Sequence, residues 1–356
     1  MRRLFALVAL LAGCTPDFDN ETTVQDLRVL GVSAEPPEVL LDGGPISMQP
    51  ELCPTADILQ ALATELAMHV PPTLPTMTLR PLVVDPQGGG RPVHYRAVAC
   101  VSPTGGIDEQ GGGGNMMPGG VRQTIGRGAC PDDAPVLGEG DVSPAPGSLS
   151  PKIEVPLPLT PNLLVGALQQ DPLGLVYGLA LTAQVTVSAG DQQVVTRKRV
   201  LVTARLTPDQ VPNQNPVIPA VSYRKTEDDP LIPYDPAQPP QVKLGEKLRL
   251  EPTAGEKQMY PTRLGDRHTG CVHTQMVSEA LRFAFFASAG TFSPDTTNTE
   301  PPVFRDPGPD VHRLESVYEA PKELLPGQSD VVHVWIVTRD ERVGSSFAEL
   351  TLRLIP

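Results

Sequence analysis

The sequence predicts an all-β protein with two β-sandwich domains and one short helical insertion, following a cleaved signal peptide. Three observations predict this class. The apolar residues, mostly Val and Leu, fall into short runs that alternate with polar residues, as the two faces of a strand do. Clusters of Pro, Gly and Asp separate these runs, in a chain with 42 prolines and 32 glycines. Finally, 356 residues exceed one typical domain and suggest two.

Residues 1–13 have the organisation of a signal peptide. Arg2 and Arg3 precede an apolar run, Leu4–Ala12, and small residues then lead to Cys14 in the sequence LAGC. As a helix this run spans about 14 Å, roughly half of the hydrocarbon core of a bilayer, so it is too short for a permanent span. The pattern resembles the lipobox of bacterial lipoproteins, which are cleaved before the cysteine. The alternative is an ordinary secretory signal that is cleaved elsewhere.

The lipobox resemblance implies a lipid anchor on Cys14, with a diacylglyceryl thioether and an N-acyl chain such as palmitate. Residues 14–24 are then a lipid-anchored tether, because they are polar and acidic without periodicity. Thr15 takes the place of the aspartate associated with inner-membrane retention in enteric bacteria. We therefore expect the protein in the outer membrane, lipid-anchored, on the periplasmic or the cell-surface face.

Residues 25–206 are predicted to form the N-terminal sandwich. A helix is expected over 55–69, with Thr55 as its N-cap and apolar residues at helical spacing. Residues 102–151 are rich in Gly and Pro and are predicted to be a loop; no Gly-Lys-Ser/Thr follows Gly111–Gly114, which argues against a phosphate-binding loop. The expected strands are Asp26–Ala34, Thr78–Val84, Val93–Val101, Leu175–Ser188 and Val194–Ala204, with a short helix at Leu163–Gln169.

Residues 207–216 are predicted to be a linker, because they are polar and punctuated by proline. Residues 217–356 then form the C-terminal sandwich. Its expected strands are Val217–Tyr223, Lys247–Glu251, Leu281–Ala287, Ser316–Glu319, Val331–Thr338 and Ser346–Leu354.

Two segments of the C-terminal region resemble Ig-like and PKD-like modules. They are the strand and turn RFAFFASAGTF, from Arg282 to Phe292, and the terminal hairpin VHVWIVTRDERVGSSFAELTLRLI. Together with the lipobox, DLRVLGVSAEPPEV and NQNPVI, the layout resembles a family of outer-membrane lipoproteins of myxobacteria. The resemblance implies an Ig-like sandwich with Trp335 in its core, and it carries no active site.

The cysteines suggest two disulfides. Once Cys14 is set aside, four cysteines remain, an even number in a chain addressed to an oxidising compartment. We favour Cys100–Cys130, because Cys100 ends a strand and Cys130 returns from a Gly-rich excursion. Cys53–Cys271 is then the remaining pair, although it crosses the predicted domain boundary. Free thiols are the alternative.

The charge of the chain disfavours nucleic acid as a partner. The formal net charge is −13 at pH 7, and no stripe of Lys and Arg interleaved with aromatic residues occurs. An acidic body would also avoid anionic lipids, which leaves the acyl chains to hold the membrane.

One motif resembles a serine nucleophile with its lysine base. Ser222 and Lys225 have the Ser-x-x-Lys spacing of the penicillin-interacting enzymes, in which one helical turn brings the two side chains together. Here the motif leaves a predicted strand and enters Asp228-Asp229-Pro230, so we do not expect that geometry.

Two further groups contain residue types that ligate metal ions. His268, Cys271 and His273 could ligate zinc or copper, but no fourth ligand is evident and Cys271 is a disulfide candidate. The acidic loops 227–235 and 306–310 lack the spacing of a Ca²⁺ loop. We therefore assign no catalytic, cofactor-binding or metal residue.

The sequence thus favours a non-enzymatic cell-envelope lipoprotein, a structural or protein-binding module. Its expected partners are the membrane, through the lipid anchor, and envelope proteins; the sequence does not indicate a small-molecule ligand. The alternative is a surface adhesin or hydrolase that acts on polysaccharide, which the 4% aromatic content does not favour because sugars stack on aromatic rings.

Overall fold

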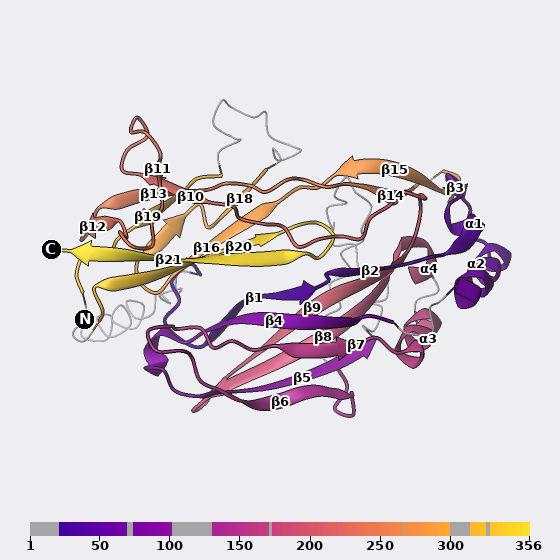
Figure 1. Ribbon diagram of the computed structural model, residues 1–356, viewed down its shortest axis with the longest axis horizontal. Coiled ribbons are helices and arrows are strands. Elements are labelled where there is room, and N and C mark those ends of the chain that lie inside the picture. The colour runs from indigo at the N-terminus through magenta and orange to yellow at the C-terminus, as the bar shows by residue number, and fades with distance from the viewer. Residues whose placement is uncertain are drawn as a thin grey trace, which may run out of the picture.

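The structure is a computed structural model that describes residues 21–69, 74–101, 130–170, 173–266, 268–299, 314–324 and 328–356. The predicted signal peptide, Cys14 and most of the predicted tether lie outside the described residues, as do 306–310 and the glycines at 111–114. The described chain is mostly β, as the sequence predicted, and its strands form two sandwiches that lie one above the other (Figure 1).

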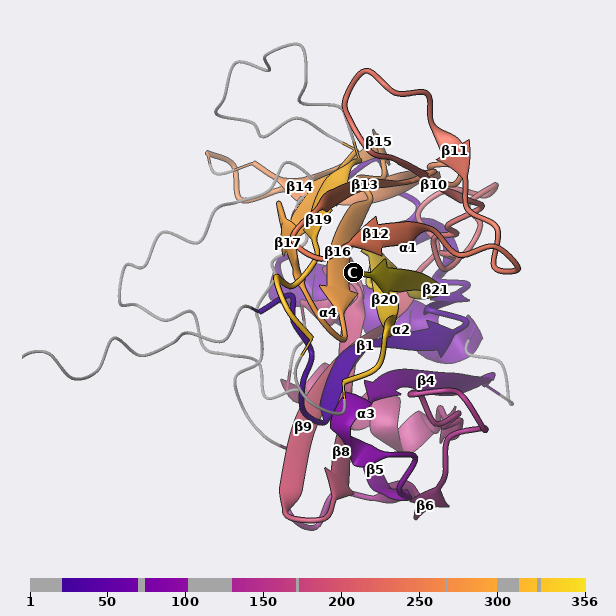
Figure 2. The same cartoon turned by 90° about the vertical axis from the view of Figure 1, so that its left-hand side faces the viewer.

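Four sheets, here called sheets I to IV, are stacked in that order (Figure 2). Sheet I comprises β2 (Glu38–Leu41), β9 (Gln192–Ala204), β8 (Leu179–Ala189), β5 (Val93–Val101) and β6 (Val136–Val142). Sheet II comprises β1 (Arg28–Glu35), β4 (Thr76–Val84) and β7 (Val155–Pro158). Sheet III comprises β12 (Gln241–Lys243), β21 (Ser345–Ile355), β20 (Val331–Arg339), β16 (Arg282–Ala287) and β18 (Thr296–Asn298). Sheet IV comprises β11 (Ile232–Pro233), β10 (Val221–Arg224), β13 (Lys247–Pro252), β19 (Ser316–Glu319) and β17 (Thr291–Ser293).

The N-terminal sandwich buries its core between sheets I and II. Alternate residues of the long β8–β9 hairpin, such as Val185 and Val200, are fully buried there. Helices close one end of this core, with Leu62, Leu66 and Leu164 among the buried residues. The helices are α1 (Gly44–Ser47), α2 (Ala56–His69), α3 (Pro161–Gln170) and α4 (Gly174–Tyr177), and η1 (Pro86–Gly88) is a single 3-10 turn.

Helix α2 occupies nearly the predicted range of 55–69. The Oγ1 of Thr55 accepts a hydrogen bond from the backbone N of Ile58 at 3.4 Å, as an N-cap does. In the part of the chain that the structure describes, every helix is too short or too polar to span a bilayer.

The C-terminal sandwich buries an aromatic core between sheets III and IV. Phe285 and Phe292 have ring centroids 5.4 Å apart, and Tyr318 lies 5.4 Å beyond Phe292. Tyr318 is fully buried, and its hydroxyl donates to the carbonyl of Ala289 at 3.0 Å. These rings are among the largest side chains of this core.

Trp335 is buried, but not in the predicted place. Alternation along β20 points Val334 and Ile336 into the C-terminal core and turns Trp335 to the opposite face of sheet III. There it packs against sheet II, in a cluster that includes Leu30 and Val84. Sheet II is therefore covered on both faces, which explains why β1 and β4 contain runs of apolar residues rather than a strict alternation.

A small sheet links the two halves of the chain. It consists of β14 (Met259–Gly265), β15 (Val272–Ser278) and β3 (Glu51–Leu52), and it extends from the C-terminal half toward the helices (Figure 1). Val272 pairs with Leu52, and both are buried in the N-terminal core.

The structure differs from the sequence prediction in several segments, among them residues 175–177, which were predicted to begin a strand and lie in α4. Residues 21–24, assigned to the tether, pack on the C-terminal sandwich: the backbone N of Val24 donates to Ala287 at 2.8 Å, and Val24 is fully buried. Strand β2, which begins directly after Pro37 and pairs in parallel with β9, was not predicted. The predicted loop 102–151 contains β6, whose Gly and acidic residues hide its strand character.

Candidate functional site at the junction of the two sandwiches

The predicted linker 207–216 is built into the junction between the sandwiches. The backbone N of Asn213 donates to Glu38 at 2.7 Å, and its side-chain amide donates to Asp340 at 3.0 Å. Two residues on, the amide of Asn215 donates to the carbonyl of Ala34 at 2.7 Å and its Oδ1 accepts from the backbone N of Ser345 at 2.9 Å. These residues therefore bind both halves and do not act as a free spacer.

The turn between β20 and β21 projects into this junction. Asp340 Oδ1 accepts from the backbone N of Arg342 at 2.8 Å and of Gly344 at 2.7 Å, which closes the turn. Within it, Val343 has a φ of 67°. A β-branched residue seldom adopts this left-handed conformation, so the surrounding contacts must hold it there.

The positively charged side chain of Arg342 extends from this turn to the N-terminal half. Its guanidinium pairs with Glu38 on β2 and lies 3.7 Å from Glu279. The same group sits over the ring of Tyr260, 4.6 Å from the centroid. The side chains of Arg342, Glu38 and Glu279 are all at most 5% exposed, so this is a buried ion-pair network and not a surface one.

Lys198 approaches the same turn from β9. Its ammonium donates to the carbonyl of Val343 and, at 3.2 Å, to the hydroxyl of Ser345. Burial lowers the pKa of Lys198 to about 8, an effect that the charge of Asp340 opposes. Burial also raises the pKa of Asp340, against its hydrogen bond from Asn213. The Lys198 ammonium thus holds the strained turn through these two hydrogen bonds, although burial disfavours its charged form.

Glu279 is the most perturbed carboxyl of the network. Burial raises its pKa to about 7, against a hydrogen bond that the carboxylate accepts from the backbone N of Gln258 at 3.1 Å. Arrangements of this kind cost desolvation energy but fix one register between two surfaces. The network therefore favours a role in positioning the two sandwiches.

The favoured disulfide Cys100–Cys130 and the remaining pair Cys53–Cys271 are both formed. Cys100 and Cys130 are joined within the N-terminal half and pack with Val98 and Ala134. Cys53–Cys271 joins residues 218 positions apart and connects the two halves beside β3 and β15. On the chain-entropy model, closing so long a loop raises the free energy of unfolding by about 5 kcal/mol.

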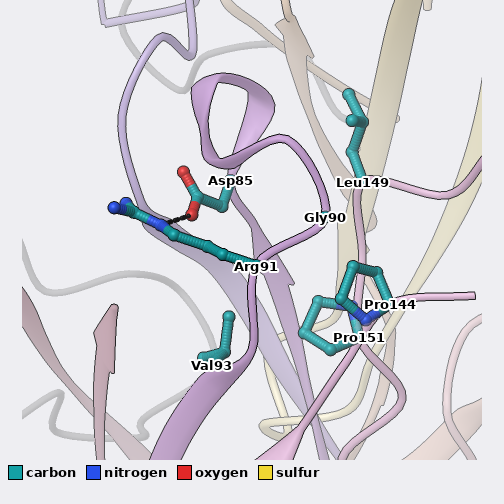
Figure 3. Close-up of a pocket in the computed structure, with 7 residues that line it drawn as sticks. All are labelled: Asp85, Gly90, Arg91, Val93, Pro144, Leu149 and Pro151. Carbon is teal, nitrogen blue, oxygen red and sulfur yellow. Dashed lines mark hydrogen bonds and ion pairs between the residues drawn. The ribbon is translucent and has the colours of Figure 1, made fainter. Parts of the chain in front are cut away.

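A shallow recess lies beside the turn after β4 (Figure 3). Its lining residues are Asp85, Gly90, Arg91, Val93, Pro144, Leu149 and Pro151. Arg91 Nε and Asp85 Oδ2 are 2.7 Å apart, and these two side chains point away from Pro144 and Pro151 (Figure 3). The pair closes the turn, and we assign no ligand to the recess.

The structure separates the residues of the Ser-x-x-Lys motif. Ser222 lies in β10, which is extended and ends at Arg224, so Lys225 does not share a helical turn with it. Two histidines lie beside acidic groups, His94 at 3.0 Å from Asp141 and His333 at 3.0 Å from Glu349, and Nδ1 of His69 is 2.7 Å from the carbonyl oxygen of Glu65.

The structure brings Cys271 and His273 to one end of β15, as the metal hypothesis required. Cys271 is oxidised in the disulfide, however, and His273 Nε2 lies 3.9 Å from Glu51 Oε1. The acidic residues at 227–229 occupy an exposed turn in which Asp229 accepts from the backbone N of Thr226 at 2.8 Å.

The charged residues of the junction were not predicted from the sequence. Glu38, Lys198 and Arg342 each look like an ordinary polar position of a strand or turn. Two of their hydrogen-bond partners lie in segments that carried the family resemblance, Asn213 in NQNPVI and Asp340 in the terminal hairpin. Neither motif indicates which distant residue it contacts.

No family model and no curated protein matches the chain. Among solved structures, dimeric latent PorU from Porphyromonas gingivalis is 8% identical, with a TM-score of 0.21, and the match covers 94% of this chain. The chain spans about a quarter of that protein's length, 24%. The C-terminal domain of the AgI/II polypeptide BspA from Streptococcus agalactiae is 9% identical, with a TM-score of 0.19, covering 79% of this chain and 93% of that domain. Likenesses this weak do not bear on function.

Proposed function

We propose that the protein is a lipid-anchored module of the outer membrane that acts as a structural or protein-binding element. Its support in the structure is the junction, where an apolar layer, a buried ion-pair network and a disulfide hold two sandwiches in one arrangement. A binding surface that spans both sandwiches is then preorganised, so that little conformational entropy is lost when a partner binds.

The anchor is supported by the sequence before Cys14, and the disulfides fit an exported protein. We expect the full-length chain, expressed in a Gram-negative host, to incorporate an alkyne-tagged fatty acid and to sediment with outer membranes. Cys14→Ser should abolish both. Labelling of the Cys14→Ser variant, or a wild-type chain that stays unlabelled and soluble, would contradict the anchor.

The binding role is tested separately from the anchor. Chemical crosslinking in intact envelopes, followed by purification of the tagged chain, should recover one or a few envelope proteins in constant ratio. The Cys14→Ser variant should lose this crosslinking if the anchor brings the partners together. A glycan array in which the purified chain binds polysaccharide, with no crosslinked protein, would favour the adhesin or hydrolase alternative.

A further inference from the structure

We propose that the Cys53–Cys271 disulfide, when reduced, becomes a zinc site that Glu51 and His273 complete. The site lies where β3 of the N-terminal half pairs with β15 of the C-terminal half. It would take a divalent cation that prefers thiolate and imidazole ligands, of which zinc is the commonest example.

The register of the two strands places the four ligand residues together. His273 pairs with Glu51 and Val272 with Leu52, and one position further along the ribbon Cys271 is bonded to Cys53. Because successive side chains of a strand alternate between faces, the Glu–His pair and the Cys pair share one face. Leu52 and Val272 occupy the other face, 2% and 1% exposed, in the N-terminal core.

The distances bring Glu51 and the two cysteines close enough to share an ion, and His273, which lies beside Glu51, must move closer to the sulfurs to join them. A carboxylate oxygen of Glu51 and the two sulfurs all lie within 4.8 Å of one another, and His273 Nε2 is 3.9 Å from Glu51 Oε1. Ligand atoms of tetrahedral zinc lie about 3.3–3.8 Å apart, given zinc–ligand bonds of about 2.0–2.3 Å. After reduction the sulfurs must therefore separate by about 2 Å. Cys53, Glu51 and His273 are exposed, so both reductant and ion reach the site from solvent.

The chemistry balances with a thiol reductant. Two thiols of the reductant give two electrons and two protons to the Cys53–Cys271 bond and are themselves joined as a disulfide. Zinc then binds and displaces the protons of both cysteine thiols, which become thiolates. The two halves of the chain are thus cross-linked in either state, through sulfur–sulfur bonding or through the metal.

The other disulfide provides an internal control. Cys100 and Cys130 are 7% and 6% exposed and pack with the apolar side chains of Val98 and Ala134. Among the residues that the structure describes, only the Cys53–Cys271 pair has a Glu, Asp or His ligand atom close enough to share an ion with both sulfurs. Reduction of Cys100–Cys130 should therefore create no zinc site.

The test measures zinc binding to the purified full-length chain before and after reduction with a phosphine. After removal of excess metal, we expect one zinc ion per reduced chain and none per oxidised chain by native mass spectrometry. Cobalt should give the intense d–d absorption of a tetrahedral site with thiolate charge-transfer bands. Glu51→Gln and His273→Gln, both surface changes, should each weaken zinc binding at least about tenfold in competition with a chromophoric chelator.

The control variants separate this site from other thiols. The double variant Cys100→Ser/Cys130→Ser should bind one zinc as the wild type does, whereas Cys53→Ser/Cys271→Ser should bind none. The proposal is overturned if the reduced wild-type chain binds no zinc, if binding survives Cys53→Ser/Cys271→Ser, or if Glu51→Gln and His273→Gln leave the affinity unchanged. Because reduction alone requires no substitution, misfolding of a variant does not obscure the first of these results.

Discussion

Different kinds of interaction hold the two ends of the junction between the sandwiches. At one end Trp335 of sheet III is fully buried against Leu30 and Val84 of sheet II. At the other end Arg342 and Glu38 form a buried ion pair within a network of directed hydrogen bonds. Apolar burial is non-directional and supplies most of the free energy, whereas the buried charges cost desolvation and are satisfied in one alignment. Affinity and register between the two sandwiches are therefore carried by separate residues.

The largest effect is expected at the apolar end. Trp335→Ala should lower the free energy of unfolding by about 4 kcal/mol, because it leaves a large cavity between sheets II and III. Trp335 is the only tryptophan, so denaturant unfolding of the full-length chain must be followed by circular dichroism. Trp335→Phe, which keeps an aromatic ring, should lose distinctly less. A loss below about 1 kcal/mol for Trp335→Ala would show that the layer is not the main source of affinity.

At the charged end, Arg342→Met should lower the free energy of unfolding by about 3 kcal/mol, because Glu38 and Glu279 then stay buried without their cation. The double variant Glu38→Gln/Arg342→Met should recover part of this loss. Arg353→Met serves as the control: its pair with Asp330 is exposed, so it should cost less than about 1 kcal/mol. Equal losses in Arg342→Met and Arg353→Met would remove the distinction between a buried and a surface network.

Only the charged end should respond to pH. Burial raises the pKa of Glu279 from 4.5 to about 7, so the folded chain binds more protons than the unfolded chain between these values. The free energy of unfolding therefore falls as pH rises through this window, by up to about 3 kcal/mol. Glu279→Gln should flatten the dependence in calorimetric melts, and Glu154→Gln, an exposed carboxylate paired with Arg80, should not. An unchanged slope in Glu279→Gln would assign the pH response elsewhere.

The smallest effect tests how closely sheets II and III approach. A Cβ added at Gly31 would lie 3.2 Å from Cγ1 of Val337, so Gly31→Ala should cost about 1 kcal/mol while the layer shifts. Gly138→Ala is the matched strand control, because its added Cβ would have its nearest neighbour at 3.6 Å, an ordinary contact. Thermal melts of the two variants should differ in that direction, and a Gly31→Ala variant as stable as the wild type would imply a looser layer.

The strands with a clear alternation could be predicted from the sequence, and those that depend on distant partners could not. Val93–Val101 and Ser316–Glu319 were predicted with their observed bounds. The short strands β11, β12, β17 and β18 have only two or three residues each, too few for a period to show. At the candidate site the sequence supplied the disulfide pairs and missed the charged network, because a buried Arg or Glu has the same local pattern as an exposed one.

The sequence by itself determined the β class, because the alternation of apolar and polar residues in a strand can be read from residues that are adjacent in the chain. It also determined that an even number of cysteines is available after Cys14, and the position of Cys100 and Cys130 around a Gly-rich segment favoured their pairing. Only the tertiary structure decided that Trp335 faces the other sandwich and that Arg342 meets Glu38, 304 positions away. A contact of that separation depends on how two complete surfaces pack, and no local pattern of side chains specifies the partner surface.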